Sequence, residues 1–205
     1  MVEFSPMLLS PGGGRPGIPL KSVHGVVVHW TGNLDKGADA IANRSFFESL
    51  NKDPNPVSAH YIVDDKRIVQ CVPETEVTYH CGARKYNPDA LALLGPYPNA
   101  TTISIESCVN VDGNGGEVYK NTVGLCGDIV ARHNLLLSRL FTHFMVTGKH
   151  CPAYFVEDEW AEKMGFPLVP GVGRAENAWQ TFKRDVRIAA RACEAAAARK
   201  GVVNG

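Results

Sequence analysis

Two histidines and one cysteine in this chain have the residue types and spacing of a metal site. His29 follows the apolar run 26–28, which has the pattern of a buried strand. His143 and Cys151 lie eight residues apart in the segment 142–152, which contains a glycine. Imidazole nitrogen and thiolate sulfur suit Zn²⁺, and three protein ligands leave a fourth position open for water, which is typical of a catalytic site. These residues predict one zinc ion per chain, bound by His29, His143 and Cys151, in a hydrolase.

Each of these residues also has an ordinary explanation. A single histidine at the end of an apolar strand is more often structural than a ligand, and a cysteine before a proline can be purely structural. Cys151 and His143 could instead form a nucleophile–base pair, as in cysteine hydrolases, although that would leave His29 without a role. His150 could compete as a ligand, but adjacent residues seldom both reach one ion well.

Two further residues could serve hydrolysis at such a metal. The bound water needs a base, and the developing oxyanion needs a positive donor. Lys149 lies two residues before the cysteine and could be that donor, although it could also be an ordinary solvated lysine. Glu106 interrupts an apolar strand, and strand alternation places it on the face opposite Ile103 and Ile105. A carboxylate there is exposed, paired or functional, and the residues alone leave these readings open.

The composition argues against several classes of function. At 205 residues, the chain is expected to form one domain, 1–205, with a substantial core. Its 21 basic and 21 acidic side chains balance, so there is no basic excess to bind nucleic acid or an anionic membrane. The N-terminus has no basic start and only a broken apolar run. We therefore expect no secretory signal, synthesis in the cytoplasm and mostly reduced cysteines.

The elements that position the candidate residues alternate between strand and helix patterns. The Gly- and Pro-rich segment 1–20 predicts an irregular arm. Strands are predicted at 23–30, 59–64, 67–72, 102–109 and 140–143. Helices are predicted at 38–50, 119–133 and 175–200. The predicted fold class is α/β, with a central mixed β-sheet flanked by helices on both sides.

Five blocks of the sequence come in a fixed order along the chain. They are VVVHWTGN (26–33), VSAHYIVD (57–64), YHCG (79–82), ISIE (103–106) and TGKHCP (147–152). In these blocks the chain resembles the zinc-dependent N-acetylmuramoyl-L-alanine amidases of the type-2 family. The resemblance runs from about Arg15 to Cys151 and more weakly through 178–183. That family includes phage endolysins, bacterial autolysins and wall-recycling amidases, and it shares its fold with peptidoglycan recognition proteins.

The resemblance implies roles for particular residues. It implies zinc in a surface groove, with the family's ligand positions at His29, His143 and Cys151. It also implies that Lys149 stabilises the transition state and that Glu106 is catalytic. Tyr61 falls where some phage members carry a catalytic tyrosine, and we favour Glu106 over Tyr61 as the base. His80 matches a groove-lining histidine for substrate binding, with Tyr79 in place of the usual tryptophan.

The resemblance implies a zinc hydrolase that cleaves the amide bond between N-acetylmuramic acid and L-alanine in peptidoglycan, as an endolysin or autolysin does. The alternatives are a cytoplasmic wall-recycling amidase and a non-catalytic peptidoglycan-binding module of the same fold. The intact ligand set argues against the module. Peptidoglycan is the expected partner, without nucleic acid or membrane. Without a signal peptide, the protein is expected to reach the cell wall after release through a lesion or a holin.

Overall fold

A six-stranded mixed sheet forms the centre of the computed structural model, which describes residues 2–203, with side chains to residue 199. The strands lie in the order β1 (Glu3–Pro6), β4 (Arg67–Gln70), β3 (Tyr61–Val63), β5 (Thr102–Ser107), β2 (Gly25–Trp30) and β6 (Leu140–Thr142). β3, β5, β2 and β6 are parallel, whereas β4 is antiparallel to β3 and parallel to β1. Parallel strands are buried on both faces, which explains the apolar run before His29.

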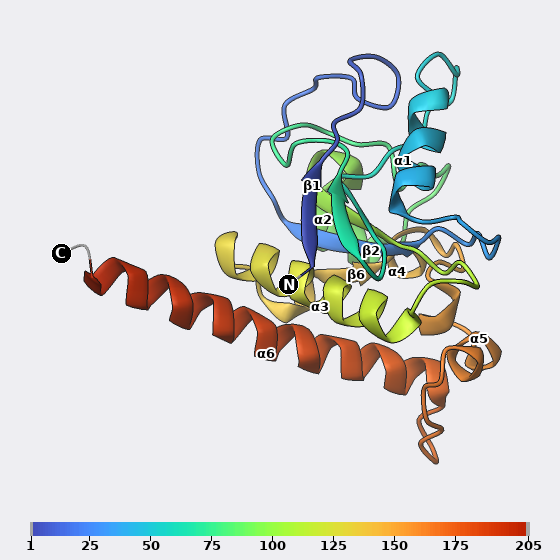
Figure 1. Ribbon diagram of the computed structural model, residues 1–205, viewed down its shortest axis with the longest axis vertical. Helices are drawn as coiled ribbons and strands as arrows, with labels where there is room; N and C mark the ends of the chain where they lie inside the picture. The colour runs from blue at the N-terminus through green and yellow to red at the C-terminus, as the bar shows by residue number, and fades with distance from the viewer. Residues whose placement is uncertain (1, 204–205) are drawn as a thin grey trace.

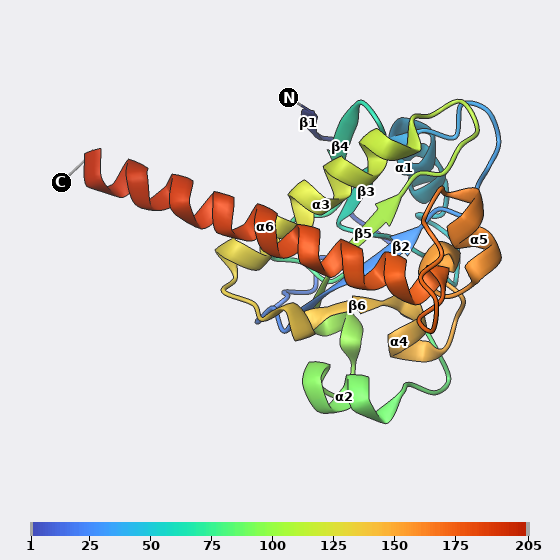
Figure 2. The same ribbon diagram turned by 90° about the horizontal axis from the view of Figure 1, so that it is seen from below.

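Two long helices cover one face of this sheet. α3 (Gly115–Arg132) and α6 (Arg174–Val203) pack against each other, and α6 continues beyond the end of α3 (Figures 1 and 2). Ile129 of α3 and Phe182 of α6 join the core formed by Val28 and Ile105 of the sheet. The helices approach closely at Gly127, where a Cβ atom would lie 2.5 Å from that of an alanine in α6.

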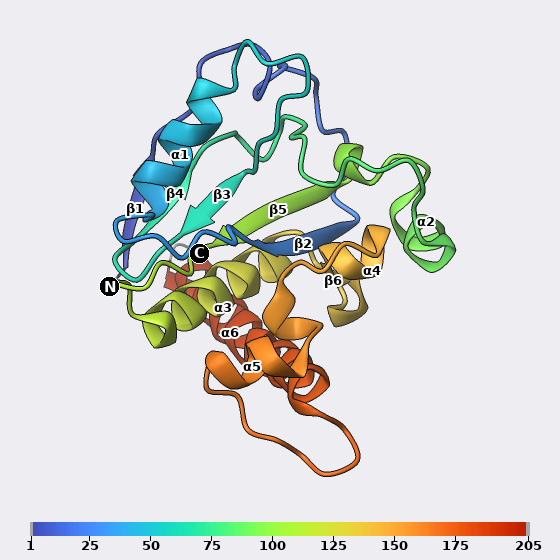
Figure 3. The ribbon, with the colours of Figure 1, turned by 90° about the vertical axis from the view of Figure 1, so that its right-hand side faces the viewer.

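The opposite face is covered mainly at its two ends. α1 (Ala40–Ser49) packs on β3 and β4, and its Phe47 belongs to a core cluster with Ile62. α2 (Pro88–Leu94) and α4 (His143–Thr147) share a second cluster with Val27 and Phe141, on β2 and β6. Figure 3 shows α1 and α2 far apart along the sheet. The ends of β2 and β5 lie between α1 on one side and α2 and α4 on the other.

The predicted fold class is confirmed, with differences in detail. The arm at 1–20 is not wholly irregular, because β1 pairs along the edge of the sheet through backbone hydrogen bonds. His143 begins α4 instead of ending a strand, because the Thr142 side chain caps that helix by accepting from the Met145 N–H at 3.1 Å. Elements that were not predicted are α2, α5 (Asp158–Lys163) and the 3₁₀ helices η1 (Pro98–Ala100), η2 (Leu137–Arg139) and η3 (Ala153–Phe155).

Two further observations concern the chemistry of the chain. All six cysteines are free thiols, and five of them are buried. Among residues 2–203, no helix combines the length and apolar character needed to cross a membrane.

Candidate metal centre

The pairing of β2 with β5 brings His29 and Glu106 together. The two residues are direct partners in the parallel register, so their side chains leave the same face of the sheet. Ile62 of β3 is the partner of Glu106 on its other side. All three residues therefore belong to the face that the helices cover mainly at its ends.

The segment after β6 carries the other two ligand candidates to His29. α4 begins at His143 and ends at Thr147. Gly148 caps its C-terminus, with a φ of 83° in the left-handed region that glycine adopts readily. The chain then reverses, and the Phe144 N–H donates to the Cys151 carbonyl at 3.1 Å. As a result, the ligand atoms of His29, His143 and Cys151 all lie within 4.8 Å of one another, and all three residues are buried.

The geometry of these donors fits zinc. The Cys151 Sγ atom lies 3.6 Å from the His29 Nδ1 atom. Zinc bound tetrahedrally to one sulfur and one nitrogen places those atoms about 3.6 Å apart. Both ring nitrogens of His143 are buried and have no hydrogen-bond partner within the described part of the chain. An unpaired buried imidazole is unusual and fits a nitrogen reserved for a metal.

Burial sets the protonation of these donors in the metal-free protein. It lowers the pKa of His143 to about 4 and the pKa of His29 well below 6.5, with the positive charge of Lys149 adding to both effects. Neutral imidazoles keep the lone pairs that ligation requires. Burial also raises the pKa of the Cys151 thiol to about 12. A cysteine nucleophile needs a thiolate near neutral pH, so this environment favours a metal ligand over a nucleophile–base pair.

Glu106 and Lys149 line the cavity beside the three donors. The Oε2 atom of Glu106 is buried and has no hydrogen-bond partner among the residues that the structure describes. Burial raises the pKa of this carboxyl to about 8, and the charge of Lys149 opposes that shift. Lys149 itself is exposed. A carboxyl that titrates near neutral pH can both accept and return a proton, which acid–base catalysis requires.

A groove passes over the three donors and has two arms. A deep arm of about 250 Å³ contains Trp30, Phe46 and Glu106 in its lining, and a wider arm of about 700 Å³ extends to Pro16 and Tyr97. The arms meet at Val57, Tyr79, His80, His143 and Lys149. Among the described residues that line the groove, Glu106 is the only one with a carboxylate and Lys149 is the only one with an ammonium group.

A family model described as N-acetylmuramoyl-L-alanine amidase matches residues 19–154, a segment that includes all three donors as well as Glu106 and Lys149. The chain belongs to this amidase family. CwlL of Bacillus licheniformis is 37% identical over 147 residues, which are 70% of this chain and 40% of that protein. XlyA of Bacillus subtilis is 31% identical over 146 residues, which are 71% of this chain and 44% of that protein. The chain thus spans less than half the length of these curated relatives.

Solved structures agree with the amidase fold. The catalytic domain of XlyA superposes with a TM-score of 0.69 at 27% identity, covering 90% of this chain and 99% of that one. PlyL superposes with a TM-score of 0.64 at 24% identity, covering 91% of this chain and 96% of the other. The sheet and its covering helices are therefore those of the amidase catalytic domains.

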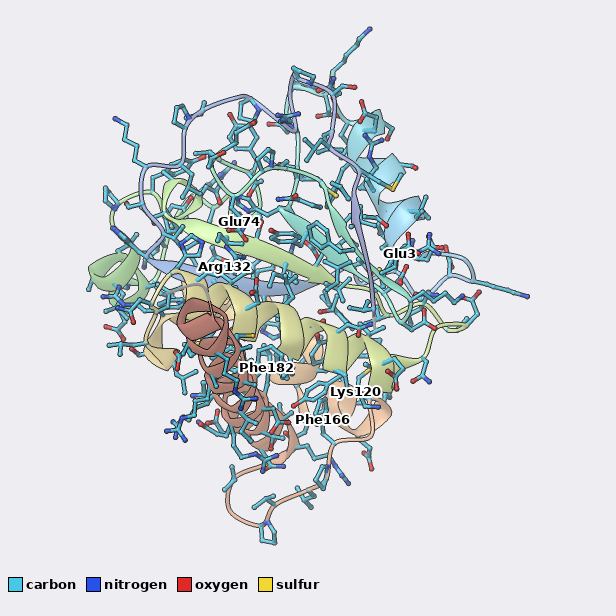
Figure 4. The ribbon with its side chains drawn as sticks, turned by 60° about the vertical axis from the view of Figure 1, so that its left-hand side comes forward. Glu3, Glu74, Lys120, Arg132, Phe166 and Phe182 are labelled. Atoms are coloured by element: carbon cyan, nitrogen blue, oxygen red, sulfur yellow. The ribbon has the colours of Figure 1, made fainter. Side chains whose placement is uncertain are left out.

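Tyr61 does not lie in the groove. Its partner across β3 and β5 is Ile105, so its side chain leaves the opposite face of the sheet, in the core under α3 and α6. The Tyr61 hydroxyl donates to the Glu74 carboxylate at 2.8 Å. Arg132 pairs with the same carboxylate at 2.8 Å, and both of these charged residues are labelled in Figure 4. The expectation of a catalytic tyrosine at this position is corrected, because the sheet separates Tyr61 from His29.

His80 lines both arms of the groove, but it is 9% exposed and its ring contacts a candidate ligand. Its Nδ1 atom lies 2.9 Å from the His29 Nε2 atom. Sequence reasoning missed this contact between residues 51 positions apart. His60, the residue before β3, is fully buried. Its ring is hydrogen-bonded to Ser104 and to the Glu76 carbonyl, which gives it a structural role.

Proposed function

We propose that this chain is a zinc-dependent amidase that hydrolyses the bond between N-acetylmuramic acid and L-alanine in peptidoglycan. The observation that carries this proposal is the buried cluster of His29, His143 and Cys151, with its 3.6 Å sulfur–nitrogen distance, in a chain of this family. Glu106 and Lys149 beside the cluster provide what a purely binding module would not need. An enzyme is therefore favoured over a non-catalytic module.

The proposed mechanism assigns a separate task to each residue. Zinc held by His29, His143 and Cys151 would act as a Lewis acid and acidify a water molecule. Glu106 accepts a proton from the attacking water and returns it to the leaving amine of L-alanine. Burial raises the pKa of this carboxyl to about 8, and the positive charge of Lys149 opposes that shift, which favours the ionised form that acts as the base. Lys149 stabilises the negative charge that develops on the carbonyl oxygen.

The shape of the groove supports an extended substrate. The scissile bond joins a glycan to a peptide, so a substrate must continue in two directions from the reacting carbonyl. The two arms meet over the donors, and the wider arm presents Tyr79 and Tyr97, whose rings can pack against sugar or peptide. We assign the groove, including His80 at its junction, to the muramyl peptide.

A lytic role is the proposed biological context. A solved structure described as a mutant endolysin from Bacillus subtilis superposes with a TM-score of 0.68 at 27% identity, covering 91% of this chain and 99% of that one. By this likeness, the proposed site of action is the cell wall.

Metal analysis of purified variants tests the proposal. The wild-type protein is expected to bind one zinc per chain, to lose activity on peptidoglycan with a chelator and to regain it with zinc. His29→Ala and His143→Ala are expected to lose both metal and activity. His24→Ala is the matched control, because His24 is exposed and its ring is hydrogen-bonded to the Ser22 side chain, away from the three donors. Full zinc content and activity in His29→Ala would overturn the assignment.

A further inference from the structure

A chain of buried hydrogen bonds leads from the backbone of η1 to the metal centre. The Thr102 hydroxyl donates to the Pro98 carbonyl, with 2.7 Å between the oxygens. The His80 Nε2 atom lies 3.0 Å from that hydroxyl, and the His80 Nδ1 atom lies 2.9 Å from the His29 Nε2 atom. The chain ends at the His29 Nδ1 atom, which faces the sulfur of Cys151.

The direction of every proton in this chain follows from its first member. A backbone carbonyl can only accept, and a threonine hydroxyl has one proton, so the Thr102 proton goes to Pro98. The hydroxyl oxygen must then accept from the His80 Nε2–H. The His80 Nδ1 atom is left with a lone pair, and it accepts from the His29 Nε2–H. The remaining lone pair of His29 lies on Nδ1, directed at the position of the metal.

The opposite direction would disable the site. If Thr102 donated to His80, two oxygen atoms without a proton between them would lie 2.7 Å apart at Pro98. His80 would then carry its proton on Nδ1, and the His29 Nδ1 atom would carry a proton in place of a lone pair. That form of His29 cannot bind a metal through the nitrogen that faces Cys151.

We propose that Thr102 and His80 are positioning residues that fix the tautomer of His29 and so prepare its Nδ1 atom for zinc. The inference rests on the proposed zinc site, which it deepens. It gives His80 a task behind the ligand, in addition to its place in the wall of the groove. Groups that hold the second nitrogen of a ligating histidine raise metal affinity by fixing the ring and its proton.

The same residues do not form a second metal site. The ligand atoms of His29, His80 and Cys81 also lie within 4.8 Å of one another. The two facing ring nitrogens are 2.9 Å apart, however, which is a hydrogen-bond distance. Two nitrogens bound tetrahedrally to one zinc lie about 3.3 Å apart. The short contact therefore assigns His80 to the hydrogen-bond chain.

Nuclear magnetic resonance of the metal-free wild-type protein tests the proton positions directly. Long-range ¹H–¹⁵N spectra distinguish an imidazole protonated on Nε2 from one protonated on Nδ1. His80→Asn and His29→Ala would identify the two sets of signals among the seven histidines. Both rings are expected to be Nε2–H tautomers. A proton on Nδ1 of His80 or of His29 would overturn the inference.

Zinc affinity tests the consequence of the fixed tautomer. Thr102→Val removes the acceptor for His80 and is expected to weaken zinc binding by about 10- to 100-fold in a chelator competition. Thr102→Ser retains the hydroxyl and should restore near wild-type affinity. Thr101→Val is the matched control, because the Thr101 hydroxyl donates to the Leu94 carbonyl at 2.6 Å, whereas the His80 ring is hydrogen-bonded to Thr102. Equal affinities for Thr102→Val and Thr101→Val would refute the positioning role.

The two readouts separate this inference from the proposed function. Nε2–H tautomers in a protein that fails to bind zinc would leave the hydrogen-bond chain intact and remove the proposed function. Tight zinc binding with a proton on His80 Nδ1 would leave the proposed zinc site intact and refute the hydrogen-bond chain. Because the proton positions are observed in the wild type, a Thr102 variant that folds poorly does not prevent a decision.

Discussion

Replacing Glu106 with glutamine should make the metal-free protein more stable, by an amount that grows with pH. Burial raises the pKa of this carboxyl from 4.5 to about 8. Between those values the folded protein holds a proton that the unfolded chain has released. The contribution of Glu106 to stability is therefore complete below pH 4.5 and is lost as the pH rises through 8. Glutamine is neutral in both states and shows no such loss.

The size of the effect follows from the separation of the two pKa values. At about 1.4 kcal/mol per pH unit, the full cost is about 5 kcal/mol above pH 8. About 2–3 kcal/mol of that cost should develop between pH 5 and pH 7. Urea unfolding of both proteins with a chelator, at several pH values, measures the difference in the free energy of unfolding. Subtracting the two curves removes the contributions of the other groups.

A half-buried carboxylate, that of Glu74, has the opposite shift and provides the control. Hydrogen bonds from Arg132, His133 and Tyr61 outweigh burial and hold the pKa of Glu74 at about 2. Its contribution is present above the unfolded value of 4.5 and is lost as the pH falls toward 2. The difference between Glu74→Gln and wild type should therefore stay constant from pH 6 to pH 9. If the difference in the free energy of unfolding between Glu106→Gln and wild type is equally independent of pH, the reasoning for Glu106 is refuted.

Three further substitutions test the assigned roles. Glu106→Gln should lower the amidase rate by roughly 10²–10⁴-fold at unchanged zinc content, and an unchanged rate would exclude Glu106 as the base. Lys149→Ala should lower the rate on the order of 10²-fold, again with zinc retained, whereas loss of zinc would indicate a structural role. Tyr61→Phe should keep its rate and lose about 1–3 kcal/mol in urea unfolding, because it loses a hydrogen bond to the charged Glu74. A slow but fully stable Tyr61→Phe would contradict its placement behind the sheet.

The position of the site could be predicted because polar residues end or interrupt apolar strands. His29 lies one residue before the end of β2, and Glu106 lies one residue before the end of β5. The two neighbouring parallel strands therefore place these residues side by side. The short spacing from His143 to Cys151 required only that the loop fold back, which Gly148 permits. These are local signals, and the observed register of β2 with β5 places the two side chains on the same face of the sheet.

The orientation of Tyr61 could not be predicted because β3 is apolar on both faces. Alternation in such a strand says that neighbouring side chains diverge, but it does not say which one reaches the groove. The register with β5 decides this by pairing Tyr61 with Ile105. β1 was missed because an edge strand in a Gly- and Pro-rich arm depends on backbone pairing with β4, which leaves little pattern in its side chains.

The link from His80 to His29 could not be predicted for a different reason. It depends on three buried contacts among residues that belong to separate segments. The YHCG block identified His80 as part of the groove, and the structure adds the direction in which its ring faces. Only the packed fold brings Thr102 and Pro98 behind it.

Analysis of the products from purified peptidoglycan tests the central claim most directly. The zinc-loaded protein should release peptides with free L-alanine amino termini and generate no new reducing sugars, by mass spectrometry and amino-terminal labelling. A chelator should stop the release, and zinc should restore it. New reducing ends, a different amino-terminal residue or release that continues without metal would contradict a zinc amidase acting at the N-acetylmuramic acid–L-alanine bond.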